Sequence, residues 1–256
     1  MNIEDLRKNI DGIDREIIKL FERRIELSSG VSDYKKENGL PLFDPARERD
    51  VIAARVEMLE DKELTPFAKR MVTELMELSK AYQLRRGMGG NIVLTGMMGS
   101  GKSCKGRLLA ERLCMDFADL DAAVEDERGM SISDIFARFG EDSFRESETA
   151  AAKKYAEKTG YVIATGGGVV LRDCNMEALK RSGKVFFLNR NIEEIAADID
   201  VSARPILKNG SEDGSEAIFE IYNSRLALYR KWCDFEMTDS GSVERCVEEI
   251  IKALYQ

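Results

Sequence analysis

The most distinctive chemical pattern of the chain is a glycine-rich run, GMMGSGKS, at residues 96–103. Glycine, four residues and then Gly-Lys-Ser is the spacing of a loop that wraps nucleotide phosphates with backbone N–H groups. The apolar stretch NIVLT precedes it, and KSCKGRLLAERL, which has helical periodicity, follows it. Strand, loop and helix in this order predict a nucleotide-binding site, with Lys102 on the outer phosphates and the Ser103 hydroxyl on Mg²⁺.

Further polar motifs follow other short apolar runs. FADLD places Asp119 and Asp121 two residues apart at the end of an expected strand, pointing to one side, although surface turns often contain such aspartates. TGGGV contains three consecutive glycines, 166–168, which favours close approach of a ligand to the backbone. DSFRESE sets Arg145 and Glu148 three residues apart on a helix, a spacing that an exposed ion pair would also explain.

A scaffold must bring these motifs together. Apolar runs at 91–95, 161–165 and 184–188, with weaker ones at FADLD and FEMTD, alternate with helical stretches. This alternation predicts an α/β domain whose parallel sheet is covered by helices on both faces. Ligands collect at the carboxyl ends of such strands, where the polar motifs fall.

The first 86 residues differ in character, since they contain three glycines against fourteen from Asn91 onward. The junction RRGMGG loses helix propensity and charge, as a linker would. We therefore expect an all-helical domain at 1–86, a linker at 87–90 and the α/β domain at 91–256.

A heptad-like apolar seam indicates one long first helix, from about residue 3 to about residue 37 and roughly 50 Å in length. A helix of that length needs a partner to cover it, so we expect an intertwined homodimer. The seam consists of Ile3, Leu6, Ile10, Ile13, Ile17 and Leu20, and its continuation reaches Arg24 and Leu27.

An arginine in an apolar seam is costly unless an anion pairs with it. FDPARERD predicts the start of a second helix, with Asp44 as N-cap and Pro45 following, and TPF predicts the start of a third. On the third helix Ser79 and Gln83 are polar groups that approach the same interior as Arg24. A dimerisation stalk with solvated charges would also explain the pattern.

The ordered stretches LRKNIDGID, FERRIEL, YKK, FDPARERD and ELSKAYQ resemble the all-helical chorismate mutases over residues 1–86. The resemblance implies rearrangement of chorismate to prephenate without a cofactor, in a site that holds a dianion and stabilises charge on the breaking ether oxygen. It implies that the first arginine comes from the partner subunit and that Lys35 and Gln83 address the ether oxygen. The implied site residues are Arg7, Arg24, Lys35, Asp44, Arg47, Glu48, Ser79 and Gln83, although an N-cap role fully explains Asp44.

Residues 91 to about 254 resemble shikimate kinase in the glycine loop, FADLD, FRESE, the triple glycine, Arg-Pro opening a lid, and LALYR. The resemblance implies ATP-dependent phosphorylation of shikimate with Mg²⁺, Asp121 assisting the attacking hydroxyl, Glu148 orienting Arg145 or a hydroxyl, and Lys102 and Arg204 acting on the phosphoryl group. The implied ATP-binding residues are Gly99, Ser100, Gly101, Lys102, Ser103, Cys104 and Arg204. The implied shikimate-binding residues are Asp121, Arg145, Gly167, Gly168 and Arg230, and the implied metal-binding residues are Ser103 and, through water, Asp119.

Composition narrows the alternatives. The net charge of −8 gives no support to a nucleic-acid or anionic-membrane surface, and the absence of histidine removes Ser-His and Cys-His mechanisms. Five scattered cysteines indicate reduced thiols, and without a leader or a membrane-length apolar run we expect a cytoplasmic protein. We therefore expect a bifunctional enzyme of aromatic amino-acid biosynthesis that binds chorismate and shikimate. The alternatives are another small-metabolite kinase, such as a gluconate kinase, and a non-catalytic dimerisation or regulatory module at the front.

Overall fold

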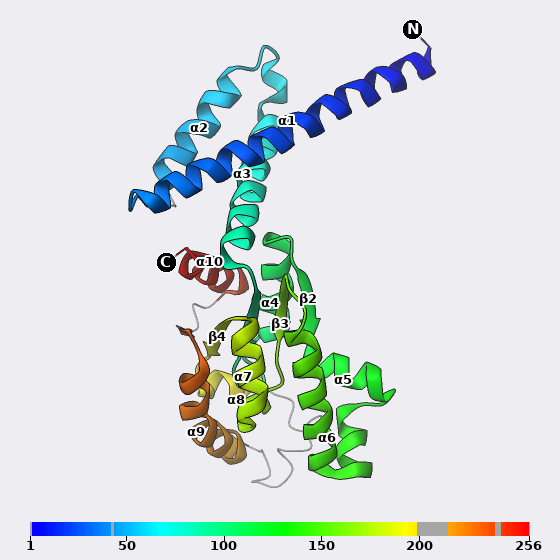
Figure 1. The fold of residues 1–256 in the computed structure, drawn as a ribbon, viewed down its shortest axis with the longest axis vertical. Coiled ribbons are helices and arrows are strands. Elements are labelled where there is room, and N and C mark those ends of the chain that lie inside the picture. Colours follow the sequence, from blue (N-terminus) through cyan, green and yellow to red (C-terminus); the bar gives the residue numbers. More distant parts are fainter. Residues whose placement is uncertain (1, 42–43, 199–214, 239–241, 256) are drawn as a thin grey trace. The chain divides into compact units, whose positions relative to one another are not determined.

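The computed structural model describes residues 2–41, 44–198, 215–238 and 242–255. It divides into two compact units, Met1–Arg86 and Gly87–Leu254 (Figure 1). No helix among these described residues is long and apolar enough to cross a membrane. The expected linker at 87–90 overlaps the end of a helix that runs to Met88, and Gly89, with φ +62°, follows that helix.

The N-terminal unit is all helical. A capping box between Asn2 and Asp5 starts the first helix, and the Asp44 side chain accepts from the backbone N–H of Arg47 at the start of the second. A short 3₁₀ turn precedes the third helix. The elements are α1 (Ile3–Glu37), α2 (Pro45–Glu57), η1 (Lys62–Leu64) and α3 (Thr65–Met88).

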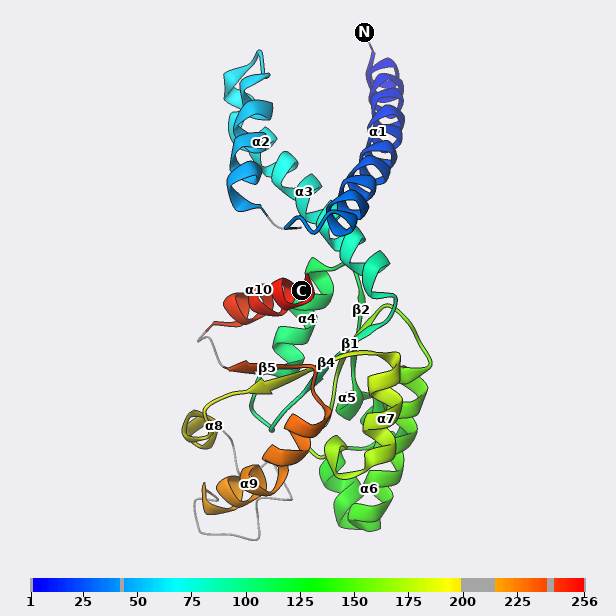
Figure 2. The ribbon, with the colours of Figure 1, turned by 60° about the vertical axis from the view of Figure 1, so that its left-hand side comes forward.

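The apolar seam of α1 has no cover within one chain. Ile10 is 55% exposed and Leu20 is 64% exposed, and the N-terminal half of α1 diverges from α2 and α3 (Figure 2). The sequence pattern of α3 predicts that a stripe of Phe67, Met71, Leu75 and Leu78 faces a core. In the single chain Leu75 and Leu78 are half-buried, but Phe67 is 72% exposed and Met71 is 60% exposed. The unit therefore leaves an extended apolar surface open.

The C-terminal unit confirms the predicted α/β class. In the described part of the chain all four strand pairings are parallel, in the order β2-β3-β1-β4-β5, and the runs predicted as strands supply these five strands. The central strand β1 is buried along its whole length, as expected for a strand covered on both faces. The strands are β1 (Asn91–Thr95), β2 (Asp116–Asp119), β3 (Tyr161–Ala164), β4 (Gly183–Asn189) and β5 (Phe235–Thr238).

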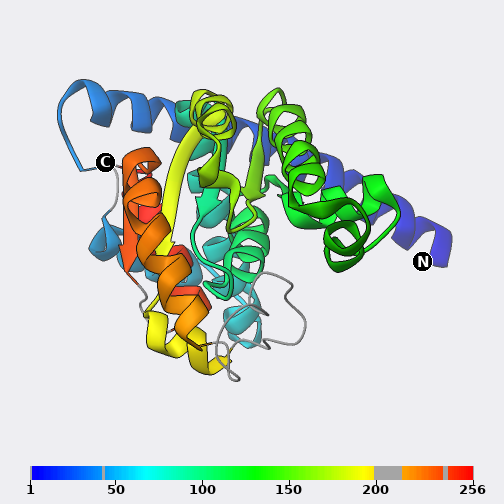
Figure 3. The same cartoon turned by 90° about the horizontal axis from the view of Figure 1, so that it is seen from below.

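Helices lie on both faces of the sheet (Figures 2 and 3). One face carries α4 and α10, which pack against each other, and α7 and α9 contact β4 from the other side. Gly140, with φ +80° and ψ 173°, interrupts α6, so this helix consists of two segments. The helices are α4 (Lys102–Arg112), α5 (Leu120–Arg128), α6 (Ile132–Ala156), η2 (Val169–Leu171), α7 (Asp173–Ser182), α8 (Ile192–Asp198), α9 (Ser215–Trp232) and α10 (Val243–Ala253).

The strand register brings the predicted motifs to one edge of the sheet. Ala164, the last residue of β3, is opposite Leu94 of β1 and Asp119 of β2. The glycine loop, the aspartate pair and the triple glycine each begin within two residues of these positions. Three motifs separated in the sequence therefore meet at neighbouring strand ends.

Candidate active site

The phosphate loop joins β1 to α4. Gly99 and Gly101 have φ values of +78° and +80°, a region that suits glycine, and Gly101 caps α4. Lys102 is 8% exposed, and its ammonium donates to the carbonyl oxygens of Gly96 and Met97 at 3.0 and 2.8 Å. A buried ammonium at a helix N-terminus forms an anion site.

Two oxygen-bearing side chains lie beside this loop. The Ser103 hydroxyl donates to Oδ2 of Asp119 at 2.5 Å, while Oδ1 of Asp119 accepts from the backbone N–H of Asp121 at 3.0 Å. Asp119 is therefore the N-cap of α5, and Asp121 lies in its first turn. Both aspartates face the same pocket, but Asp121 does not continue the strand, because the strand ends at Asp119 and helix α5 begins at the next residue.

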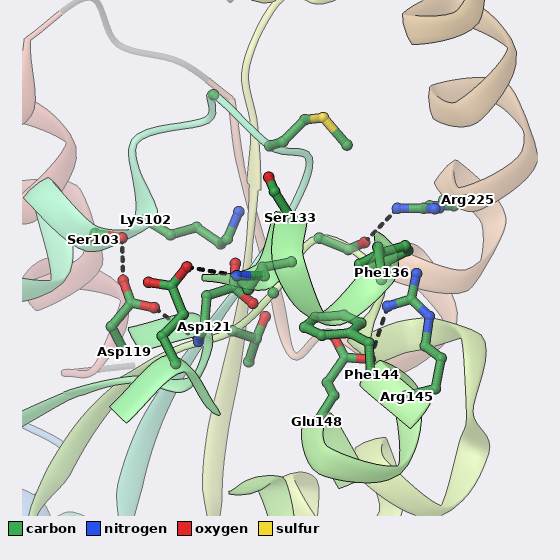
Figure 4. Close-up of a pocket in the computed structure, with 18 of the residues that line it drawn as sticks. Lys102, Ser103, Asp119, Asp121, Ser133, Phe136, Phe144, Arg145, Glu148 and Arg225 are labelled. Carbon is green, nitrogen blue, oxygen red and sulfur yellow. Dashed lines mark hydrogen bonds and ion pairs between the residues drawn. The ribbon is translucent and has the colours of Figure 1, made fainter. Parts of the chain in front are cut away.

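A pocket of about 550 Å³ opens next to the loop. Figure 4 shows Lys102, Ser103 and Asp119 on one side of it and Arg145 and Arg225 on the other. Most of the predicted kinase residues line it: Gly99, Gly101, Lys102, Ser103, Cys104, Asp119, Asp121, Arg145, Glu148, Gly167 and Gly168. The lining residues that the sequence reasoning missed are Met98, Glu125, Ile132, Ser133, Phe136, Phe144, Thr165 and Arg225, together with Gly166 from the triple glycine.

Charged side chains of the pocket lie close to the backbone of the triple glycine. A Cβ on Gly166 would stand 2.5 Å from Oδ1 of Asp121 and 2.7 Å from Oε1 of Glu148, and a Cβ on Gly168 would overlap the Arg145 guanidinium. Side chains at these positions would displace the charged groups of the pocket. Glycine at positions 166 and 168 therefore leaves room for the charged side chains of the pocket, whereas we expected close approach of a ligand to this backbone.

Arg145 and Glu148 form a buried ion pair, so the exposed-pair alternative is wrong. Nη1 of Arg145 lies 3.0 Å from Oε2 of Glu148, and the two residues are 5% and 1% exposed. Glu141 holds the other side of the guanidinium, at 2.8 Å from Nη2. Burial raises the pKa of Glu148, against the opposing effect of Arg145, and its Oε1 has no hydrogen-bond partner among the described residues.

The second guanidinium of the pocket belongs to Arg225, whereas we expected Arg230. Arg230 points elsewhere and pairs with Glu236, Nε to Oε2 and Nη2 to Oε1, both at 2.9 Å. Arg225 is 6% exposed and shares a buried stripe of α9 with Ile218 and Tyr229 at helical spacings of seven and four residues. Arg230 follows Tyr229 directly and is turned about 100° away from that stripe.

Of the predicted ATP-binding residues that the structure describes, Ser100 is the one that does not line the pocket. Ser100 is fully buried beneath the loop, where its N–H donates to the carbonyl oxygen of Met97 at 3.2 Å. Arg204 lies outside the residues that the structure describes.

In the N-terminal unit, part of the predicted set meets where α1 and α3 approach each other. Nη1 of Arg24 donates to the Ser79 hydroxyl and to the carbonyl oxygen of Leu75, and Nε2 of Gln83 donates to the carbonyl oxygen of Ser28 at 2.8 Å. Burial, with a smaller effect of Arg55, lowers the pKa of Arg24. A bound anion at this point would offset both the burial of the Arg24 guanidinium and its repulsion by Arg55.

The other predicted residues are less enclosed in one chain. Glu48 pairs with Lys80 of α3 at 2.9 Å, a contact that the sequence reasoning missed. Asp44 is exposed and occupied as an N-cap, which agrees with its alternative reading. Arg7 and Arg47 are exposed, and Lys35 is half-buried in the last turn of α1.

A phosphate loop on a parallel five-stranded sheet, facing a pocket with two buried guanidinium groups, defines a small-molecule kinase. The profile of shikimate kinase matches residues 98–255, and the profile of chorismate mutase type II matches residues 6–84. The chain belongs to the shikimate kinase family and carries a chorismate mutase type II domain in front. It is a bifunctional enzyme of aromatic amino-acid biosynthesis, an isomerase joined to a transferase.

Individual relatives cover the kinase region. Shikimate kinase of Clostridium botulinum (strain Alaska E43 / Type E3) is 41% identical over 167 residues, which are 65% of this chain and 98% of the relative. Shikimate kinase of Thermodesulfovibrio yellowstonii is 43% identical over 164 residues, 63% of this chain and 93% of the relative. A solved structure, shikimate kinase from Acinetobacter baumannii in complex with shikimate, is 32% identical with a TM-score of 0.62, covering 64% of this chain and 92% of that chain.

Proposed function

We propose that the C-terminal unit transfers the γ-phosphoryl group of ATP to a ring hydroxyl of shikimate and that the N-terminal unit converts chorismate to prephenate. One observation carries the kinase half: a single pocket joins the phosphate loop to the buried guanidinium groups of Arg145 and Arg225. A small acid with hydroxyl groups fits between the phosphate-binding loop and these two arginines, which can bind its carboxylate. The cytoplasm, where ATP is available, is the compartment that this proposal implies.

The side chains divide the work of phosphoryl transfer. Arg145 and Arg225 bind the carboxylate of the acceptor, and the ammonium of Lys102 exchanges its loop carbonyls for the outer phosphates. The acceptor oxygen forms a bond to the γ-phosphorus as the bond between that phosphorus and ADP breaks, and the hydroxyl proton passes to Asp121. Catalysis in this scheme comes from position and charge. Arg204 remains a predicted partner of the transferring phosphoryl group.

The residues beside the loop fit Mg²⁺. Ser103 and Asp119 bring a hydroxyl and a carboxylate within 2.5 Å of each other, and such hard oxygen donors suit this ion together with phosphates and water. Among the described residues no group of three or more acidic or sulfur ligands forms a separate metal site. Ser103 and, through water, Asp119 would hold the ion, which would neutralise phosphate charge.

For the mutase half we propose a homodimer through α1. Arg7 precedes Arg24 by 17 residues on the same helix, α1, which separates them by about 25 Å along the helix at 1.5 Å per residue. Both cannot bind one small dianion from the same chain. A second copy laid along the exposed seam of α1 would bring its own Arg7 to the site of Arg24 and cover the apolar side chains.

In each such site the arginines hold the two carboxylates of chorismate, Lys35 and Gln83 address the ether oxygen, and Glu48 accepts from the ring hydroxyl. This division of roles is the one that the resemblance to the all-helical chorismate mutases implies, for a rearrangement that needs no proton transfer.

Purified full-length protein tests both halves. ATP-dependent phosphorylation should occur with shikimate and not with gluconate, and Lys102→Met should abolish it. Chorismate absorbance should fall on addition of the wild-type protein and remain stable with Arg24→Ala. Phosphorylation of gluconate in preference to shikimate would refute the acceptor assignment, and stable chorismate with correctly folded wild type would leave the front as a non-catalytic module.

A further inference from the structure

Lys105 of α4 is a buried cation behind the phosphate loop. It is 6% exposed, and its ammonium donates to the carbonyl oxygen of Ser100 at 3.1 Å. Lys105 is not among the described residues that line the pocket, whereas Gly101 is. The lysine therefore binds the loop from the side opposite to the pocket.

This contact fixes the direction of a backbone N–H group. In a trans peptide the N–H points away from the C=O of the same unit, and the described residues contain no cis peptide bond. Because the Ser100 carbonyl points to Lys105, the N–H of Gly101 points away from Lys105 and toward the pocket. The lysine stem supports Gly101 closely, since Cε would lie 3.3 Å from a Cβ at that position.

The preceding peptide unit is held in a similar way. Nη1 of Arg190 donates to the carbonyl oxygen of Gly99 at 3.2 Å, and its Nε and Nη2 bind Glu194 and Asp198 of α8. Two side-chain cations from different elements thus bind consecutive carbonyls of the loop. Of the N–H groups of these two peptide units, that of Ser100 donates to the carbonyl oxygen of Met97, whereas that of Gly101 faces the pocket.

Lys105 belongs to the first turn of α4, at the positive end of the helix dipole, and the same turn carries the buried Lys102. A polyphosphate in the pocket would be attracted by both lysines, and low exposure limits the screening of that attraction.

We propose that Lys105 is a positioning residue for the nucleotide, which orients the Gly101 N–H and adds positive charge behind the loop. It thereby sets the affinity for ATP and ADP without contacting shikimate. The proposal rests on the nucleotide-binding part of the proposed function.

Calorimetric titration of the full chain with ADP and Mg²⁺ tests this role. Lys105→Met should weaken ADP binding about tenfold, the effect of losing one charged hydrogen bond. The KM for ATP should rise by a similar factor, while the affinity for shikimate, measured without nucleotide, should not change. Lys105→Arg should restore most of the affinity, and Lys153→Met, a loss of an exposed lysine on α6, is the matched control.

Unchanged ADP affinity in Lys105→Met would overturn the proposal, as would an equal loss of shikimate affinity, which indicates general destabilisation. Should Lys105→Met fail to fold, Lys105→Gln keeps a donor without the charge and must show the same selective loss. Wild-type protein that binds ADP in a Lys105-dependent manner but does not phosphorylate shikimate would refute the proposed acceptor and leave this inference standing.

Discussion

The hydroxyl of Tyr229 donates a 2.5 Å hydrogen bond to the carbonyl oxygen of Gly167, in the middle of the triple glycine. The same oxygen accepts from Nη1 of Arg225 at 3.0 Å. Tyr229 is fully buried and stacks on Phe187 with ring centroids 4.9 Å apart. Burial raises the pKa of Tyr229 to about 12, so the hydroxyl keeps its proton at neutral pH.

Tyr229→Phe should therefore loosen the backbone at Gly167, which lines the pocket for the acceptor. We expect a loss of about 1 kcal/mol in the free energy of unfolding and a rise of several-fold in the KM for shikimate, with the KM for ATP nearly constant. Urea unfolding and steady-state kinetics measure these effects. Tyr222→Phe is the control, because Tyr222 lies on the same helix as Tyr229 and its hydroxyl donates a 3.0 Å hydrogen bond to Oδ1 of Asn189. A shikimate KM equal in both variants would contradict this role.

The two arginines of α9 should differ sharply when replaced. Arg225→Ala should raise the KM for shikimate by about a hundredfold, because a buried charge-assisted contact to the carboxylate disappears. Arg230→Ala should leave both KM values unchanged, since its guanidinium is half exposed and bound to Glu236. The reverse ranking in steady-state kinetics would restore Arg230 as the carboxylate ligand.

Glu148 should impose a pH dependence on stability. The pKa of Glu148 is raised above the ordinary 4.5 in the folded protein. The contribution of protonated Glu148 to the free energy of unfolding is therefore complete below pH 4.5, and it is lost as the pH rises through the raised pKa. Glu148→Gln removes this titration, so the variant should gain stability relative to wild type as pH rises from about 5 to 8. Urea unfolding across that range measures the difference, and a constant difference would show that Glu148 does not titrate there.

Mixing two inactive mutase variants tests the shared site. Arg7→Ala and Arg24→Ala should each abolish chorismate loss. After joint unfolding and refolding, the mixed dimer contains one site with both arginines intact, so about a quarter of the wild-type sites should return. No recovery, with mixed dimers demonstrated by differential tags, would place Arg7 and Arg24 of the same chain in one site.

The strands and the glycine loop were predictable because they depend on local patterns. NIVLT has an apolar centre and is buried along its whole length, and Pro45 after Asp44 marks a helix start by backbone geometry alone. The error at Asp121 arose because the apparent strand pattern in FADLD continues past the residue where Asp119 caps a new helix.

Arg225 was missed for a different reason. SRLALYR offers two arginines, and only the burial of Tyr229 on one face of α9 distinguishes them. The Lys80 contact with Glu48 depends on how α2 and α3 pack, which no local pattern encodes. Spacing within an element was informative, whereas partners between elements required the tertiary structure.

The exposed apolar seam of α1 has a consequence for the balance of the two activities. The kinase pocket is built within one chain, but the mutase site that we propose needs two. Mutase activity per chain would then fall on dilution below the dissociation constant of the pair, while kinase activity per chain would not. The ratio of flux through the two steps would thus depend on how much of this enzyme a cell makes.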